Sequence, residues 1–327
     1  MRRALLAALV VALLLVPLGV DRVYSAYYLN LFTWVLIFGL FAMALDVSLG
    51  YGGLVSFGHA AFFGAGAYGA ALTLKHVVFS LPACLLAGVV AAALVALVVA
   101  CFAVESRGVY LAMLTFAFAQ LLYESAMKWV SVTGGSDGLP GPGRPPLALG
   151  PIEIALADRE QMYYVVVAFV IVGYAVARRL VRSPFGAALV AVRENETRAA
   201  AIGIDVNRHK RVALVLSGAL SGLAGALFAL FQNFVSPELL FWAMSGEVVI
   251  MALLGGLGTL YGGMIGAVIA VGFREVLSTY TDNWLVFLGA LYVLCVMFFP
   301  QGLARLRRRR AAQDQSTGLT PAEASHP

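Results

Sequence analysis

The sequence predicts an all-α polytopic membrane protein, and three observations indicate this fold class. Of the 327 residues, 61% are hydrophobic and only 12% are charged, roughly half the charged share of a soluble domain. Apolar runs recur from the N-terminus to Pro300, and each is about 20 residues long, enough for one helix to cross a bilayer. The sequence lacks the alternating strands of about ten residues that build a membrane barrel. We therefore expect about ten transmembrane helices.

The expected spans follow from these runs and from the connectors that end them. The first run, MRRALLAALVVALLLVPLGV, also resembles a secretory signal peptide, but no small-residue cleavage site follows it, which favours a retained first span. Later spans are expected at residues 29–49, 54–74, 81–104, 109–130, 163–177, 212–231 and 285–299. The stretch 246–279 is too long for one ordinary span and contains several glycines, so we expect a break or tight turn there.

A basic segment at residues 178–211 sets the expected topology. It carries eight Lys or Arg against three acids, an excess equal to the formal charge of +5 of the whole chain. Lys and Arg collect on the cytoplasmic side of short loops, and Arg2, Arg3 and the run 305–310 give the same signal. Placing all three inside requires an even number of crossings between them, which the stretch 246–279 supplies only if it folds back at its glycines. About ten crossings satisfy this rule, and eight with a re-entrant hairpin are the alternative.

The same rule places the remaining polar segments. The loop 131–160 is rich in Pro and Gly and holds two basic against four acidic residues, which is typical of an external loop. The C-terminus is expected in the cytoplasm, where residues 311–327 form a polar tail that is predicted to be disordered. Residues 1–310 would then form one transmembrane domain.

Two glycine-rich turns resemble one another, LGYGGLVSFGHAAFFGAGAYGA at 49–70 and LGGLGTLYGGMIGAVIA at 254–270. Similarity between two such segments indicates internal repeats in transporters, whose broken helices line the transport path. Alternatively, the glycines only permit close helix packing. Ionisable groups inside a membrane are functional candidates, although groups near helix ends are often interfacial or paired with backbone. The candidate path residues are Asp46, Gly52, Gly53, Ser56, His59, Glu247, Gly255 and Gly256.

Several chemistries are excluded by the sequence. No Gly-Lys dipeptide occurs, so a nucleotide-binding phosphate loop is absent. The four histidines lack metal-ligand spacing, and no catalytic constellation is recognisable. We expect a non-catalytic protein without a cofactor, a metal or a nucleic-acid partner, which takes energy for uphill transport from another chain or from an ion gradient.

The basic segment also contains a candidate contact for a soluble subunit. A turn at Ser183–Gly186 opens it, and good helix formers from Arg193 to Ile202 precede Gly203, which can end a helix. Such a short amphipathic helix fits a groove on a partner protein. The alternative is a basic loop that binds anionic lipid headgroups.

Four segments resemble a known family, namely DVSLGYGGLVSFGHAAFFGAGAYGA, TGGSDGL, SPFGAALVAVRENETRAAAIGID and SGEVVIMALLGGLGTLYGGMIGA. They are similar to the LivM-type permease subunits of bacterial branched-chain amino acid ABC importers, over residues 36–303. The resemblance implies a bacterial inner-membrane location and a LivH-like second permease. It further implies two cytoplasmic ATPases, which hold ATP and Mg, and a periplasmic binding protein. Urea and short-chain amide importers are similar, and a self-sufficient ion-coupled transporter that uses Asp46, His59 or Glu247 is the alternative class.

The resemblance also implies roles for particular residues. Segment 193–205 would be the coupling helix, although Thr197 stands where the family's glutamate belongs and Glu196 comes one residue early. The binding protein would dock on Gly135, Ser136 and Asp137 of the external loop. The implied ATPase-coupling residues are Arg193, Glu194, Glu196, Arg198, Ala199, Ala200, Gly203 and Asp205.

Overall fold

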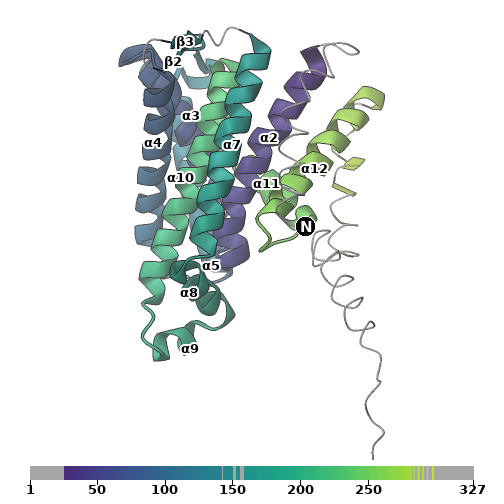
Figure 1. Cartoon of the computed structure of the whole chain (residues 1–327). Coiled ribbons are helices and arrows are strands. Elements are labelled where there is room, and N and C mark those ends of the chain that lie inside the picture. Colours follow the sequence, from purple (N-terminus) through teal and green to yellow (C-terminus); the bar gives the residue numbers. More distant parts are fainter. Residues whose placement is uncertain are drawn as a thin grey trace, which may run out of the picture.

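The computed structural model describes residues 26–281 except 142, 150–151 and 155–157, together with scattered positions between 283 and 297. Within this part the chain is mostly helical, and its longer helices pack side by side (Figure 1). These helices are α2 (Ala26–Asp46), α3 (His59–His76), α4 (Leu81–Ala103), α5 (Val109–Lys128), α7 (Arg159–Val181), α10 (Val206–Gln232), α11 (Trp242–Gly255) and α12 (Tyr261–Tyr280).

Six of the described helices are long and apolar enough to cross a membrane, namely α2 with its continuation to Tyr51, α4, α5, α7, α10 and α12. The helix α11 is apolar but has only 14 residues. The prediction of a multi-pass helical membrane protein is therefore confirmed. The first expected span, the basic run 305–310 and the tail lie outside the described residues, and so does most of the span expected at 285–299.

The break expected within 246–279 is confirmed. The helix α11 ends at Gly255, and α12 begins only at Tyr261. Between them the backbone has positive φ at Gly256, Gly258 and Leu260, with values of 102°, 74° and 58°. Glycine adopts such angles at little cost, whereas Leu260 is an outlier that needs outside support.

The span expected at 54–74 is wrong at its start. A π-helix, η1 (Val47–Tyr51), continues α2, and the chain then runs without regular structure until α3 begins at His59. The three glycines within residues 50–53, with φ of 67° at Gly53, favour this break over a continuous helix. The structure thus has two breaks, at residues 52–58 and at residues 256–260.

The core is built on the close approach of α3, α4 and α10. A Cβ on Gly222 of α10 would overlap the Ala92 side chain of α4, and one on Gly225 would overlap the Phe63 carbonyl oxygen of α3. These two glycines therefore make one face of α10 a close helix-packing face.

The two long connectors lie at opposite ends of the bundle (Figure 1). At one end lie α8 (Pro184–Glu194) and α9 (Glu196–Ala201), which belong to the basic segment. At the other end, the loop 131–160 forms the hairpin of β2 (Leu147–Leu149) and β3 (Ile152–Ile154). The same loop contains α6 (Val130–Thr133), η2 (Gly135–Asp137) and β1 (Leu139–Pro140), and β1 pairs antiparallel with β4 (Phe234–Val235).

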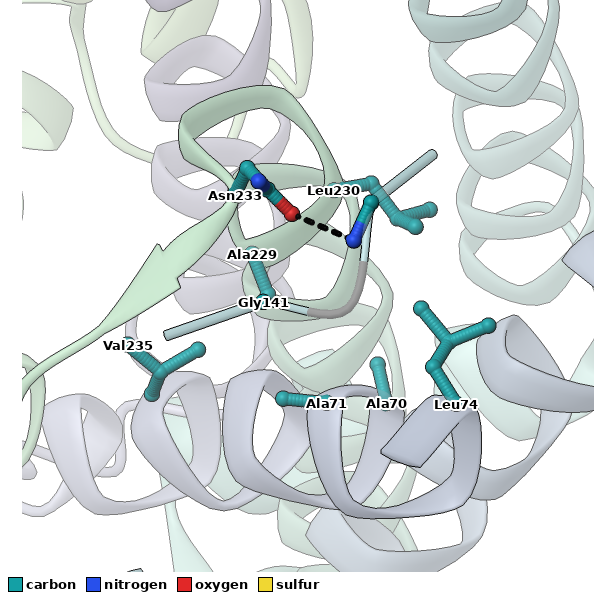
Figure 2. Close-up of a pocket in the computed structure, with 9 residues that line it drawn as sticks. Ala70, Ala71, Leu74, Gly141, Ala229, Leu230, Asn233 and Val235 are labelled. Atoms are coloured by element: carbon teal, nitrogen blue, oxygen red, sulfur yellow. Dashed lines mark hydrogen bonds between the residues drawn. The ribbon is translucent and has the colours of Figure 1, made fainter. Parts of the chain in front are cut away.

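The loop 131–160 is fixed to the end of α10 by Asn233, as Figure 2 shows. The side-chain oxygen of Asn233 accepts a hydrogen bond from Gly143 N at 3.1 Å, and its backbone oxygen accepts one from Gly141 N at 2.9 Å. A shallow pocket under this contact is lined mainly by alanine and leucine side chains of α3 and α10. These bonds hold the loop close to the helix ends.

Candidate functional site

The two breaks are joined by Asp46, which lies at the end of α2 with 1% of its surface exposed. One carboxylate oxygen accepts a hydrogen bond from Gly258 N at 2.6 Å. The other accepts from Thr259 N at 3.1 Å and Leu260 N at 2.9 Å. These amides precede the first turn of α12, where helix N–H groups lack partners and a negative charge is stabilising. The carboxylate from α2 thus caps α12 and holds the break at residues 256–260.

Gly50 lies inside this contact. A Cβ on Gly50 would overlap Asp46 Oδ1 and would come within 2.5 Å of Gly258 N. Only glycine lets the η1 backbone lie this close to the second break. The predicted path residues around the two glycine-rich turns are therefore brought together, with Asp46 between them.

His59 begins α3 and is fully buried in a network of hydroxyl groups. Its Nε2 lies 2.8 Å from Ser217 Oγ and 3.1 Å from Ser48 Oγ, and its Nδ1 lies 3.1 Å from Ser56 Oγ. Ser217 Oγ also donates to the Ala44 carbonyl at 2.6 Å. The network joins α2, η1, α3 and α10, so His59 and Ser56 fasten the first break to the core.

Two further hydroxyl groups hold this break and the first turn of α3. The Phe57 N–H donates to Thr115 Oγ1 of α5 at 3.1 Å, and the Ala60 N–H donates to Ser245 Oγ of α11 at 2.8 Å. None of Ser217, Thr115 and Ser245 was predicted as a site residue, because each stands among apolar or small residues. The available signal was a hydroxyl group within an apolar helix, which has to find a hydrogen-bond partner.

The expected single helix from Arg193 to Ile202 is divided in two. The helix α8 ends at Glu194, and α9 begins at Glu196. Asn195 is extended between them, and its side chain accepts a hydrogen bond from Arg198 N at 2.9 Å. An Asn side chain competes with helical backbone bonds and favours the N-cap position. The prediction of one rigid helix over 193–205 is corrected to two helices with a capped corner.

The predicted stop at Gly203 is confirmed. Gly203 has φ of 87°, Gly203 N donates to Ala200 O at 3.0 Å, and Ile204 N donates to Ala199 O at 3.1 Å. This pair of bonds is the Schellman end of a helix. Asp205 then caps α10 by accepting from Arg208 N at 3.0 Å.

The coupling candidates separate into outward and inward side chains. Glu194, Arg198, Ala200, Gly203 and Asp205 are exposed, whereas Ala199 is buried. The tip of the segment also carries Ile202, which is 72% exposed. Ile202 was not predicted as a surface residue, although a large apolar residue directly before the helix-ending Gly203 is a usable signal.

Arg193 points inward, toward the first break. Its guanidinium donates to the Gly50 carbonyl and pairs with Glu194. Its methylene groups cover Gly53, since a Cβ on Gly53 would lie 2.7 Å from Arg193 Cγ. Gly52 approaches α8 as well, where its nearest side chain is Leu189. Arg193 therefore contacts the path candidates rather than the outer surface.

Glu196 links the basic segment to neighbouring elements through two ion pairs. Its carboxylate pairs with Lys210 of α10, which is 3% exposed, and with Arg107 of the α4–α5 connector at 2.8 Å. Phe185 of α8 stacks on His209 of α10 with ring centroids 5.4 Å apart. The corner formed by α8 and α9 is thus fixed to the start of α10.

Replacing Glu196 with Gln is expected to destabilise the protein by about 3 kcal/mol, because it leaves the buried Lys210 ammonium without its counter-charge. Thermal unfolding of the detergent-solubilised protein measures this loss. Glu194→Gln is the matched control, because Glu194 has an exposed side chain. Equal unfolding temperatures for the two variants would contradict a stabilising role for the Glu196–Lys210 ion pair.

The remaining candidates lie on α11 or at its C-terminal end. Glu247 of α11 pairs with Arg274 of α12 at 3.2 Å, and the Arg274 guanidinium lies 5.3 Å from the centre of the Trp34 ring. Gly255 packs against the Gly262 backbone where α11 meets α12, and Gly256 is the first residue of the second break.

The docking candidates form η2 in the loop 131–160, whose β2–β3 hairpin lies at the end of the bundle opposite α9. Gly135 is buried, whereas Ser136 and Asp137 are exposed. Only the latter two therefore offer side chains to a partner at this position.

These features define a polytopic helical membrane protein with discontinuous helices whose breaks are clamped together. Residues 27–296 match the family described as the permease component of branched-chain amino acid transport systems. The chain belongs to this family.

Individual relatives agree with this assignment. The chain is 30% identical to the high-affinity branched-chain amino acid transport system permease protein LivM of Salmonella typhimurium, over 91% of this chain and 74% of the relative. The corresponding LivM of Escherichia coli is also 30% identical, over 91% and 75%. A probable LivH permease protein of Methanocaldococcus jannaschii is 36% identical over 31% of each chain. No solved structure matches.

Proposed function

We propose that this chain is the LivM-type permease subunit of an ATP-driven importer that carries leucine, isoleucine, valine or a related small solute into a bacterial cell. It works with a LivH-like second permease, two cytoplasmic ABC ATPases, which bind ATP and Mg, and a periplasmic binding protein. The observation that carries the proposal is the α8–α9 corner, which projects from one end of the bundle with Ile202 exposed and its own base held by ion pairs.

The topology follows from the same corner. With α8 and α9 in the cytoplasm, the eight longer helices and two further spans, expected within 1–20 and at 285–299, give about ten crossings. Both termini then lie in the cytoplasm, and the transmembrane domain covers residues 1–310. The loop 131–160 is external, where Ser136 and Asp137 meet the binding protein.

The α9 tip has the chemistry of a docking surface for a protein partner. Ile202 offers an apolar anchor, and exposed Arg198 and Glu194 surround it with both signs of charge. Exposed apolar side chains within a polar rim are typical of protein interfaces. Binding to anionic lipid headgroups would need only basic residues and no apolar anchor.

The test is reconstitution of the four membrane and ATPase subunits in proteoliposomes with the binding protein, followed by uptake of labelled leucine. We expect uptake that requires ATP and is competed by isoleucine and valine. Competition by urea or short amides instead would shift the substrate class. Uptake by this chain alone, abolished by collapse of the proton gradient and indifferent to ATP, would overturn the proposal.

Docking is tested by charge substitution at the tip. Ile202→Glu and Arg198→Glu together are expected to reduce ATPase co-purification at least about tenfold, because an anchor of an interface is lost. Membrane insertion should stay normal. Lys128→Glu, at the far end of α5, is the matched control, and equal co-purification for tip and control variants would argue against docking at α9.

A further inference from the structure

We propose that Arg193, Gly50 and Asp46 form a relay that carries movement of the α8–α9 corner to both helix breaks. The proposal rests on the proposed function, because a bound ATPase supplies the movement. Three consecutive contacts make up the relay. Arg193 contacts Gly50 O, Gly50 contacts Asp46, and Asp46 binds the amides of residues 258–260.

The first contact acts on main chain. The Arg193 guanidinium holds the carbonyl of Gly50, and its methylene groups lie against the Gly53 backbone. Because the partners are glycines, Arg193 is the side chain that joins α8 to this backbone, and its guanidinium is held by both Gly50 O and Glu194. A shift of α8 is therefore passed directly to the backbone of the first break.

The element that receives this contact is itself adjustable. Gly50 belongs to η1, a π-helical turn that continues α2. A π-turn is a local departure from α-helical register and is frequent at functional sites. A pull on the Gly50 carbonyl can change this register without unfolding α2.

The second contact joins the two breaks. Gly50 is pressed against Asp46 Oδ1 and Gly258 N, so displacement of η1 also displaces the carboxylate that caps α12. Asp46 holds Leu260, whose φ of 58° is sparsely populated for a residue with a side chain. Such a backbone keeps its conformation only while its surroundings fix it. Movement of Asp46 therefore changes the turn that sets α11 against α12.

The α8–α9 corner, at the outer end of the relay, is held rigidly by its contacts and can therefore transmit a movement. Glu196 ties α9 to Lys210 and Arg107, and Leu189 of α8 is buried against Gly52. Phe185 of α8 also stacks on His209 of α10, so force on the exposed tip near Ile202 moves α8, α9 and the start of α10 together rather than bending the segment at Asn195. The described contacts give one continuous path from the outer surface to the break at 256–260.

The test uses Arg193→Met, which retains the methylene groups over Gly53 and removes only the guanidinium. Arg198→Met is the matched control, because Arg198 is exposed on α9. The first measurement is hydrogen–deuterium exchange of the peptide spanning residues 256–262 in the purified protein. We expect exchange about tenfold faster in Arg193→Met, the factor for loss of one charge-assisted hydrogen bond, and unchanged exchange in Arg198→Met.

The second measurement is leucine uptake per ATP hydrolysed by the reconstituted importer. Arg193→Met should lower this ratio about tenfold while ATPase co-purification stays at the wild-type level. Combining it with Asp46→Asn should give little further loss, since residues in one series are not additive.

The outcomes separate the relay from the proposed function. Wild-type exchange at 256–262 in Arg193→Met, or multiplied losses in the double variant, would overturn the relay even if uptake is normal. Failure of the wild-type importer to carry leucine would instead overturn the proposed function. The exchange measurement would still show whether Arg193 is coupled to the break at 256–260.

Discussion

Asp46→Ala is expected to be the most damaging single substitution among the described residues. It leaves the backbone N–H groups of Gly258, Thr259 and Leu260 without their acceptor, and the latter two residues are buried. Each buried donor without a partner costs about 1–3 kcal/mol. Several kcal/mol is a large part of the stability of a folded protein. We expect little folded protein, and a strongly lowered unfolding temperature for what is recovered.

Two controls make this result specific. Asp46→Asn keeps one acceptor oxygen and should be intermediate, because only part of the cap is lost. Asp137→Ala removes a carboxylate from an exposed turn and should leave the unfolding temperature unchanged. Fluorescence-detected size exclusion and thermal unfolding in detergent measure both. A stable Asp46→Ala protein that has lost only uptake would show that Asp46 serves the transport path rather than the fold.

The helix break between α11 and α12 could be predicted because it depends on properties that can be counted along the sequence, namely span length, hydropathy and charge. Length and hydropathy limit each span, and placing the basic residues of 178–211 and 305–310 on the same side requires an even number of crossings between them. The glycines at 255–263 then offer a place for the turn. This reasoning located the break between α11 and α12 without knowledge of any contact.

The site itself depends on contacts between distant residues, which periodicity and charge cannot give. The sequence marks Asp46 as an ionisable residue near a glycine turn, but its partners lie more than two hundred residues later. Arg193 belongs to a basic run, and only the tertiary structure decides that it turns toward Gly50. Ser217 stands in the sequence among the small residues that pack α10, and only the tertiary structure shows that its hydroxyl group contacts His59.

The corner at Asn195 shows a different limit. The residues on either side of Asn195 are good helix formers, so propensity favours one continuous helix. The local competition is decided by a single side-chain bond to Arg198 N. Such a cap is recognisable from sequence only when its helix start is already known.

Arg274→Leu is expected to destabilise the protein by about 3 kcal/mol, because it leaves the Glu247 carboxylate between α11 and α12 without its counter-charge. The value is at the lower end for buried pairs, since 21% of the Arg274 side chain and 25% of the Glu247 side chain stay exposed. The substitution also removes the guanidinium from the Trp34 ring, a contact worth about 0.5–2 kcal/mol. Thermal unfolding in detergent measures the sum.

The double variant Glu247→Leu with Arg274→Leu separates packing from transport. Replacing both members of a buried pair by apolar residues is often neutral for stability, so the unfolding temperature should return close to that of the wild type. Retained leucine uptake in the double variant would make the pair a structural link between α11 and α12. Lost uptake in a stable double variant would place Glu247 and Arg274 on the transport path, where a charged pair can hold the ammonium and carboxylate of an amino acid. The pair is suited to this comparison because it lies outside the contacts that Asp46 and Arg193 make.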